Sequence, residues 1–175
     1  MYIRWEPKYE TGHPLIDAEH RLLVMLFRKL DVAIKTREPE ATLVRIVLEV
    51  KKFVEFHFVS EENLMLESAY PEAEAHRMRH RELLLELIAR IDRLHAHSEF
   101  PDEVLDFLFR WLSEHIAHED QLVARHLLAS DLRPVAEMIY AEYLGAAAPR
   151  LANDGLAPVF GDAINPPPSP PQKAG

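Results

Sequence analysis

The 175-residue chain is predicted to be all-α, an up-down-up-down four-helix bundle with an irregular N-terminal arm. Apolar residues recur at helical spacings over four stretches of ~20–28 residues, the length range of bundle helices. Proline-containing breaks separate these stretches. Gly12 is the only glycine before Gly145, and this shortage argues against β-hairpins.

The four helices are expected at about residues 16–36, 39–66, 71–94 and 101–128. Residues 1–15 show no sustained period and are expected to form the arm. The pair Glu38-Pro39 ends the first helix, and Pro39 suits the first turn of the second. The breaks after the second and third helices are Ala69-Tyr70-Pro71 and the segment 95–101. These short connections favour antiparallel neighbours.

The domain organisation changes after residue 130. Residues 1–130 are expected to form the bundle, and residues 131–145 contain a short additional helix with Val135, Met138, Ile139 and Tyr143 on its apolar side. Residues 146–175 hold seven of the 13 prolines, including the run from Pro166 to Pro171. This composition predicts a disordered or polyproline-like tail.

Composition excludes several function classes. A net charge of −9 argues against nucleic acid or an anionic membrane surface as the main partner. The chain has no cysteine, which excludes disulfides, iron–sulfur clusters and thiolate chemistry. No apolar leader or span of membrane length is present, so no membrane insertion is expected and a cytoplasmic location is the default.

Three spaced pairs of polar residues interrupt the apolar stripes of the helices. They are His57 and Glu61, His76 and His80, and His115 and Asp120, and the single His20 precedes them. Polar groups facing a core must be compensated, and a metal ion compensates both imidazole and carboxylate. In an antiparallel bundle the four locations meet at the same end.

Together these seven residues offer five imidazoles and two carboxylates, too many for one zinc ion with about four ligands. They suit two ions, one with three imidazoles and one with two, with the carboxylates bridging and one position left open for a small ligand. Any one histidine alone would more often be a core or helix-end residue, and His57 with Glu61 alone could be a surface pair.

Some neighbouring residues have two interpretations. Helical spacing alone favours Glu119 over Asp120 as the partner of His115, because residues four apart share a face. Asp17 is expected either to begin the first helix or to accept a hydrogen bond from an imidazole. Glu62 is expected to be a surface residue.

The chain resembles the hemerythrins, in particular the single-domain bacterial ones, over about residues 5–129. The resemblance rests on Trp5 and on the segments GHPLIDAEH (12–20), HFVSEE (57–62), YPEAEAHRMRH (70–80) and WLSEHIAHED (111–120). It implies two non-haem iron ions per chain. His76, His80 and His115 would bind one ion and His20 and His57 the other, with Glu61, Asp120 and an oxo or hydroxo group bridging. Leu112 matches the leucine that lines the oxygen pocket, and the family pattern selects Asp120 rather than Glu119.

The function implied by this resemblance is reversible dioxygen binding for storage, delivery or buffering, without enzymatic activity. Delivery would imply an O2-consuming protein as the partner. Two alternatives stay open: a sensor of oxygen or redox state acting through the C-terminal extension, and a di-iron enzyme that consumes peroxide or nitric oxide. The choice of iron over manganese or zinc comes from the resemblance.

Overall fold

The computed structural model describes residues 3–130, apart from the side chains of Leu112 and Ser113. A short 3-10 helix, η1 (Pro7–Tyr9), precedes the long helices α1 (Pro14–Lys35), α2 (Glu40–Glu67) and α3 (Ala73–His95). The fourth long element is composite. It consists of α4 (Pro101–Glu114), a π-helical segment η2 (His115–Asp120) and α5 (Gln121–Ala129).

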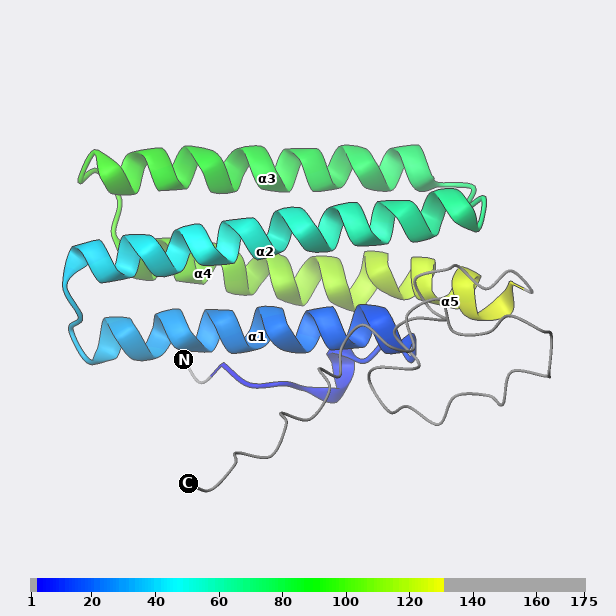
Figure 1. Ribbon diagram of the computed structural model, residues 1–175, viewed down its shortest axis with the longest axis horizontal. Coiled ribbons are helices and arrows are strands. Elements are labelled where there is room, and N and C mark those ends of the chain that lie inside the picture. The colour runs from blue at the N-terminus through cyan, green and yellow to red at the C-terminus, as the bar shows by residue number, and fades with distance from the viewer. Residues whose placement is uncertain (1–2, 131–175) are drawn as a thin grey trace, which may run out of the picture.

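The predicted all-α four-helix bundle is confirmed. Helix α1 packs against α2 and α4, and α3 packs against the same two helices. Figure 1 shows the long helices lying side by side with short connections at alternate ends. The helix bounds differ from the predicted ones by a few residues, except that the single helix expected at 101–128 contains the π-helical segment. The part of the chain from residue 3 to 130 contains no strand.

Two apolar clusters fill the bundle. The larger one runs along all four helices and includes Phe27, Leu108 and, from the arm, the fully buried Ile3 and Tyr9. The smaller one lies around α5, and its buried members are Leu15, Ile16, Leu64, Met65, Val123, Ala124 and Leu127. Along α1 and α2 the polar residues expected at the site fall between these clusters, because His20 follows Ile16 and His57 precedes Leu64.

Three helix ends close in the same way without glycine. Arg37, Ala69 and His97 have positive φ angles of 56°, 52° and 55°, and each follows the C-cap residue of α1, α2 or α3. In each case the backbone N–H of the next residue reaches the carbonyl five positions back, as Tyr70 N does to Met65 O at 2.9 Å. These are Schellman motifs, which satisfy carbonyls that the helix leaves unpaired. The left-handed conformation therefore does not require glycine here.

The helix predicted within 131–145 and the tail predicted for 146–175 lie outside the described residues. Within residues 3–130, no helix combines the length and the apolar character needed to cross a membrane.

Leu108→Ala is expected to lower the free energy of unfolding by about 2–5 kcal/mol, because it leaves a cavity in the core. Leu108 is fully buried in the larger cluster. Leu85→Ala is the matched control, since Leu85 is 56% exposed and its truncation removes few contacts. Urea denaturation of both variants measures the difference, and equal effects would contradict the assigned core.

Candidate metal centre

All seven predicted site residues lie at one end of the bundle and are 4% exposed or less. Four elements supply them. His20 comes from α1, His57 and Glu61 from α2, His76 and His80 from α3, and His115 and Asp120 from η2. Their ligand atoms form two groups, each with all atoms within 4.8 Å of one another. The structure therefore brings the four predicted polar positions together at one end of the bundle.

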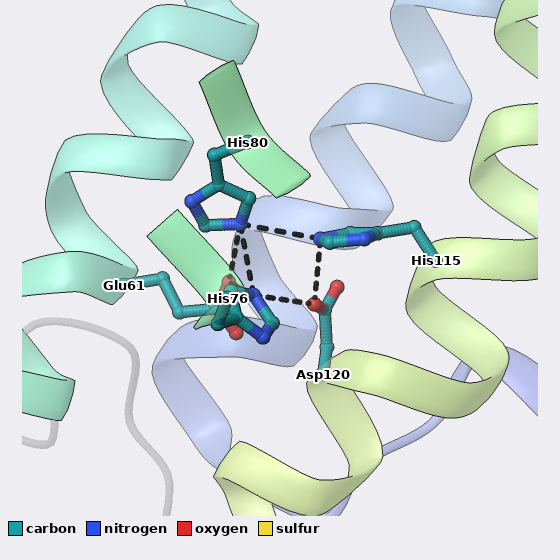
Figure 2. A group of neighbouring side chains, drawn as sticks. All are labelled: Glu61, His76, His80, His115 and Asp120. Atoms are coloured by element: carbon teal, nitrogen blue, oxygen red, sulfur yellow. Dashed lines mark hydrogen bonds and ion pairs between the residues drawn. The ribbon is translucent and has the colours of Figure 1, made fainter. Parts of the chain in front are cut away.

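The first group contains three imidazoles and two carboxylates that point toward one another, as Figure 2 shows. His80 Nε2 lies 2.9 Å from His76 Nε2 and 3.2 Å from His115 Nε2. Glu61 Oε2 lies 3.2 Å from His76 Nε2 and 3.3 Å from His80 Nε2. Nitrogens and oxygens that normally accept hydrogen bonds thus surround a shared centre.

The second group contains His20, His57 and Asp120. Asp120 belongs to both groups, because its Oδ2 lies 3.0 Å from His20 Nε2 and its Oδ1 lies 3.0 Å from His115 Nε2. Glu61 is grouped with the three imidazoles only. Asp120 therefore has the geometry of a bridge between the two groups, whereas a bridging role for Glu61 stays a prediction.

The π-helical segment η2 explains why Asp120, five residues after His115, reaches the same centre. In a π-helix the backbone hydrogen bonds span five residues, so residues i and i+5 lie one turn apart on the same side. Glu119, which α-helical spacing favours, instead pairs with Arg79 at 3.1 Å and is partly exposed. Spacing on an ideal α-helix is therefore the wrong guide at this position.

Two further carboxylates, which the sequence patterns did not assign to the site, hold the outer nitrogens of two imidazoles. His57 Nδ1 donates to Glu19 Oε2 at 2.9 Å, and His80 Nδ1 donates to Glu62 Oε1 at 3.1 Å. The expectation that Glu62 is only a surface residue is wrong. Such contacts fix the tautomer so that Nε2 offers its lone pair to the centre. Adjacency to expected ligands, Glu19 before His20 and Glu62 after Glu61, was the available sequence signal.

Asp17 lies in the first turn of α1, and its carboxylate binds the arm rather than an imidazole. Its carboxylate accepts from Thr11 N at 2.7 Å, Thr11 Oγ1 at 2.8 Å and Gly12 N at 3.0 Å. Gly12 has a φ of 81°, in the left-handed region that favours glycine. These bonds fold the arm onto the first turn of α1 and so set the position of His20.

Aromatic rings pack against the imidazoles. Phe58 is stacked on His80 with ring centroids 3.8 Å apart, and Trp111 lies 6.0 Å from the ring of His115. Leu112 lies in α4, but its side chain is outside the described part, so its predicted place in a ligand pocket stays a prediction. Rings fixed by packing on one side and hydrogen bonds on another lose little freedom when they bind a ligand.

Four of the histidines not assigned to the site have structural partners, among them His97, whose Nδ1 lies 2.9 Å from Glu40 Oε1. His13 caps the start of α1, where its Nδ1 accepts from Ile16 N at 3.4 Å. His118 is exposed and donates to Glu114 O, and His126 donates from Nε2 to Ser68 O at 2.9 Å. His126 thereby ties α5 to the end of α2.

The charges of the site favour a cation at its centre. Burial alone would lower the pKa of His76, but the adjacent carboxylates of Asp120 and Glu61 raise it to about 10. Burial and the charge of Asp120 would raise the pKa of Glu61, but hydrogen bonds from His76 and His80 lower it to about 2. A proton on His76 therefore compensates the two carboxylates when no metal is bound.

Several buried atoms lie close to polar neighbours but make no well-directed hydrogen bond. Among the described residues they include His57 Nε2, Glu61 Oε1, both ring nitrogens of His20 and both oxygens of Asp120. Leaving such groups unsatisfied costs about 1–3 kcal/mol each, and more when they are charged. All are ligand types that hold divalent iron, manganese or zinc. The residues present therefore fit a centre of two metal ions.

Residues 11–127 match the family described as the hemerythrin HHE cation binding domain, which covers more than half of the chain. The chain belongs to the hemerythrin family. The resemblance drawn from the sequence is thereby confirmed.

Relatives and solved structures agree with this family. The chain is 32% identical to a bacteriohemerythrin of Stenotrophomonas maltophilia over 126 residues, or 71% of this chain and 81% of that protein. It is 28% identical to a bacteriohemerythrin of Clostridium acetobutylicum over 124 residues, or 67% and 95% of the two chains. A crystal structure of wild-type hemerythrin superposes on 74% of this chain and 100% of its own, with a TM-score of 0.67 and 24% identity, and shows the shared fold.

Metal affinity is expected to rise with pH between about 6.5 and 10. His76 has a pKa raised to about 10, so at neutral pH it must lose a proton before its Nε2 can bind metal. Release of one proton corresponds to about a tenfold gain in affinity per pH unit. Calorimetric Zn²⁺ titrations at several pH values, in buffers of different ionisation enthalpy, measure the metal affinity and the number of protons released on binding. A pH-independent affinity would contradict the charged state of His76.

Proposed function

We propose that the protein holds two iron ions per chain and binds dioxygen reversibly, for storage, delivery or buffering. The observation that carries the proposal is the pair of overlapping, imidazole-rich groups that share Asp120. Two ions joined by one carboxylate can act on a single small ligand, and bound iron would supply the redox-active centre at which dioxygen is held.

The proposed roles follow the two groups. His76, His80 and His115 would hold one ion, and His20 and His57 the other. Asp120 would bridge the ions, and Glu61 would join it through the oxygen that has no partner, Oε1. An ion held by His20 and His57 would have fewer protein ligands, so it would be the one left able to take up a small ligand.

The surroundings support binding rather than conversion of dioxygen. Carboxylate-rich sites characterise the ferritin-like di-iron bundles, whereas five of the seven ligands here are imidazoles. Apolar residues of both clusters, among them Ile16, Phe58 and Leu64, lie on either side of the site. A site enclosed in this way excludes water and limits the delivery of protons to a reduced ligand.

One observation favours a second candidate, an enzyme that consumes peroxide or nitric oxide. A surface cavity of about 280 Å³ between α3 and α4 reaches His115, and Glu114 and Glu119 are among its lining residues. Such an opening offers a polar reactant a path and nearby acids a route for protons. The cavity lies beside the three-imidazole group and not beside the group of His20 and His57, where a small ligand is proposed to bind. The enzyme is therefore the weaker candidate.

A third role, sensing through the C-terminal extension, rests on residues 131–175, outside the described part. The division into a bundle of residues 1–130 and this extension is part of the proposal. Comparing the oxygen response of partner binding in the full chain and in a chain ending at 130 tests the role.

Asp120→Ala is expected to reduce iron from two ions per chain to one or none, because Asp120 belongs to both groups. Glu119→Ala is the matched control. Its carboxylate pairs with Arg79 outside the site, so two ions should remain. Metal analysis of protein loaded anaerobically with Fe²⁺ gives the count. Full loading of Asp120→Ala would contradict the bridging role, and loss in Glu119→Ala alone would contradict the π-helical register.

Reversible oxygen binding is expected to show in the visible spectrum. When the anaerobically reduced iron protein meets O2, an absorption band should appear and then vanish when O2 is removed, over repeated cycles. Immediate passage to an oxidised form, with turnover of added peroxide or nitric oxide, would reject the carrier function and support the enzyme.

A further inference from the structure

Glu19 is a buried carboxylate beside the second group, in which it is not itself a candidate ligand. Its residue is 3% exposed. Both oxygens are held across the interface of α1 and α2. Oε2 accepts from His57 Nδ1 at 2.9 Å, and Oε1 accepts from Ser60 Oγ at 2.7 Å. Burying a carboxylate is costly, so its retention at this place calls for a compensating partner or a positive ion nearby.

The matching carboxylate on the first group is placed differently. The carboxylate of Glu62 is neither fully buried nor without a basic partner. Its side chain is 23% exposed, and its Oε2 pairs with Arg77 at 3.3 Å. Among the described residues, no lysine or arginine forms a salt bridge with Glu19, whose ionic contact is with His57 alone. Glu19 thus places a carboxylate, paired with no described lysine or arginine, next to the group that has fewer imidazoles.

We propose that Glu19 is a positioning residue that holds His57 with its proton on Nδ1 and increases the donor strength of Nε2. This inference rests on the proposed two-ion centre. A charge-assisted hydrogen bond to Nδ1–H fixes the ring orientation and makes the opposite nitrogen more basic. The negative charge also favours the more highly charged state of the ion, so it lowers the reduction potential of the ion bound by His57.

Ser60 orients Glu19. Ser60 lies on α2 one turn after His57, and the bond from its hydroxyl to Oε1 leaves Oε2 directed at the imidazole. The chain Ser60–Glu19–His57 therefore links the two helices at the level of the site. Ser60→Ala is expected to lower the affinity for the second ion less than Glu19→Ala does, because the carboxylate itself remains.

Metal titration tests the positioning role without reference to oxygen. In Glu19→Ala, affinity for the second Zn²⁺ is expected to fall about 10- to 100-fold, and affinity for the first ion should change little. Glu19→Gln keeps the volume and an acceptor for His57 Nδ1–H, so it should restore much of the affinity. Glu49→Gln is the control, an exposed carboxylate paired with Lys29 away from the site. Circular dichroism and thermal unfolding establish that each variant is folded.

Two readouts separate positioning from general stability. Nitrogen-15 NMR of the Zn²⁺-loaded protein should show His57 protonated at Nδ1 in the wild type and in Glu19→Gln. In the iron-loaded protein, Glu19→Gln should raise the reduction potential of the second ion. Glu62→Gln should change the potential of the ion bound by His80 less, because Arg77 already offsets the charge of Glu62.

The outcomes distinguish this inference from the proposed function. A wild-type protein that binds fewer than two ions overturns both. Two-ion binding with unchanged second-ion affinity in Glu19→Ala, or an unchanged potential in Glu19→Gln, overturns the role of Glu19 and leaves the proposed centre intact.

Discussion

The structure depends on the convergence of groups that accept hydrogen bonds in a space with little water. Nε2 atoms of three imidazoles stand within about 3 Å of their neighbours around Glu61 and Asp120. Without a positive charge at the centre these lone pairs repel one another and the carboxylates lack solvation. A proton on His76 meets part of this demand, and metal ions would meet it more fully. Folding and metal binding would therefore be coupled, because the folded chain assembles the candidate site.

The rest of the bundle holds this arrangement in place. Apolar clusters lie on both sides of the polar layer, so a shift of any helix along its axis would move a ligand out of register and expose apolar surface. The capped start of α1, in which Asp17 binds Thr11 and Gly12, fixes the height of His20. The contact of His126 with Ser68 does the same for the end of α2 relative to α5. The packing of the core therefore also fixes the positions of the site residues.

The sequence predicts the bundle and the meeting of its polar positions because both follow from helical period and connection length. His57 and Glu61 interrupt a 3.6-residue stripe, and so do His76 and His80, which makes them visible without a structure. The place of Asp120 is different, since a search at α-helical period cannot reveal a π-helical turn and selects Glu119. Glu19 and Glu62 escape such a search because their contacts cross between helices, and which acidic residue reaches which imidazole depends on packing.

The π-helical segment also bears on how this chain can change over evolution. A π-bulge is equivalent to one extra residue within an α-helix, and each residue turns a helix by about 100°. If the six residues of η2 became a regular α-helix with none removed, α5 would turn by about 100° and Val123, Ala124 and Leu127 would turn away from their cluster. Removing one residue together with the bulge would instead keep α5 in its present orientation and place the carboxylate four residues after the imidazole. The position of the candidate ligand Asp120 and the packing of α5 are therefore set together, so a one-residue deletion here should be tolerated better than loss of the bulge alone.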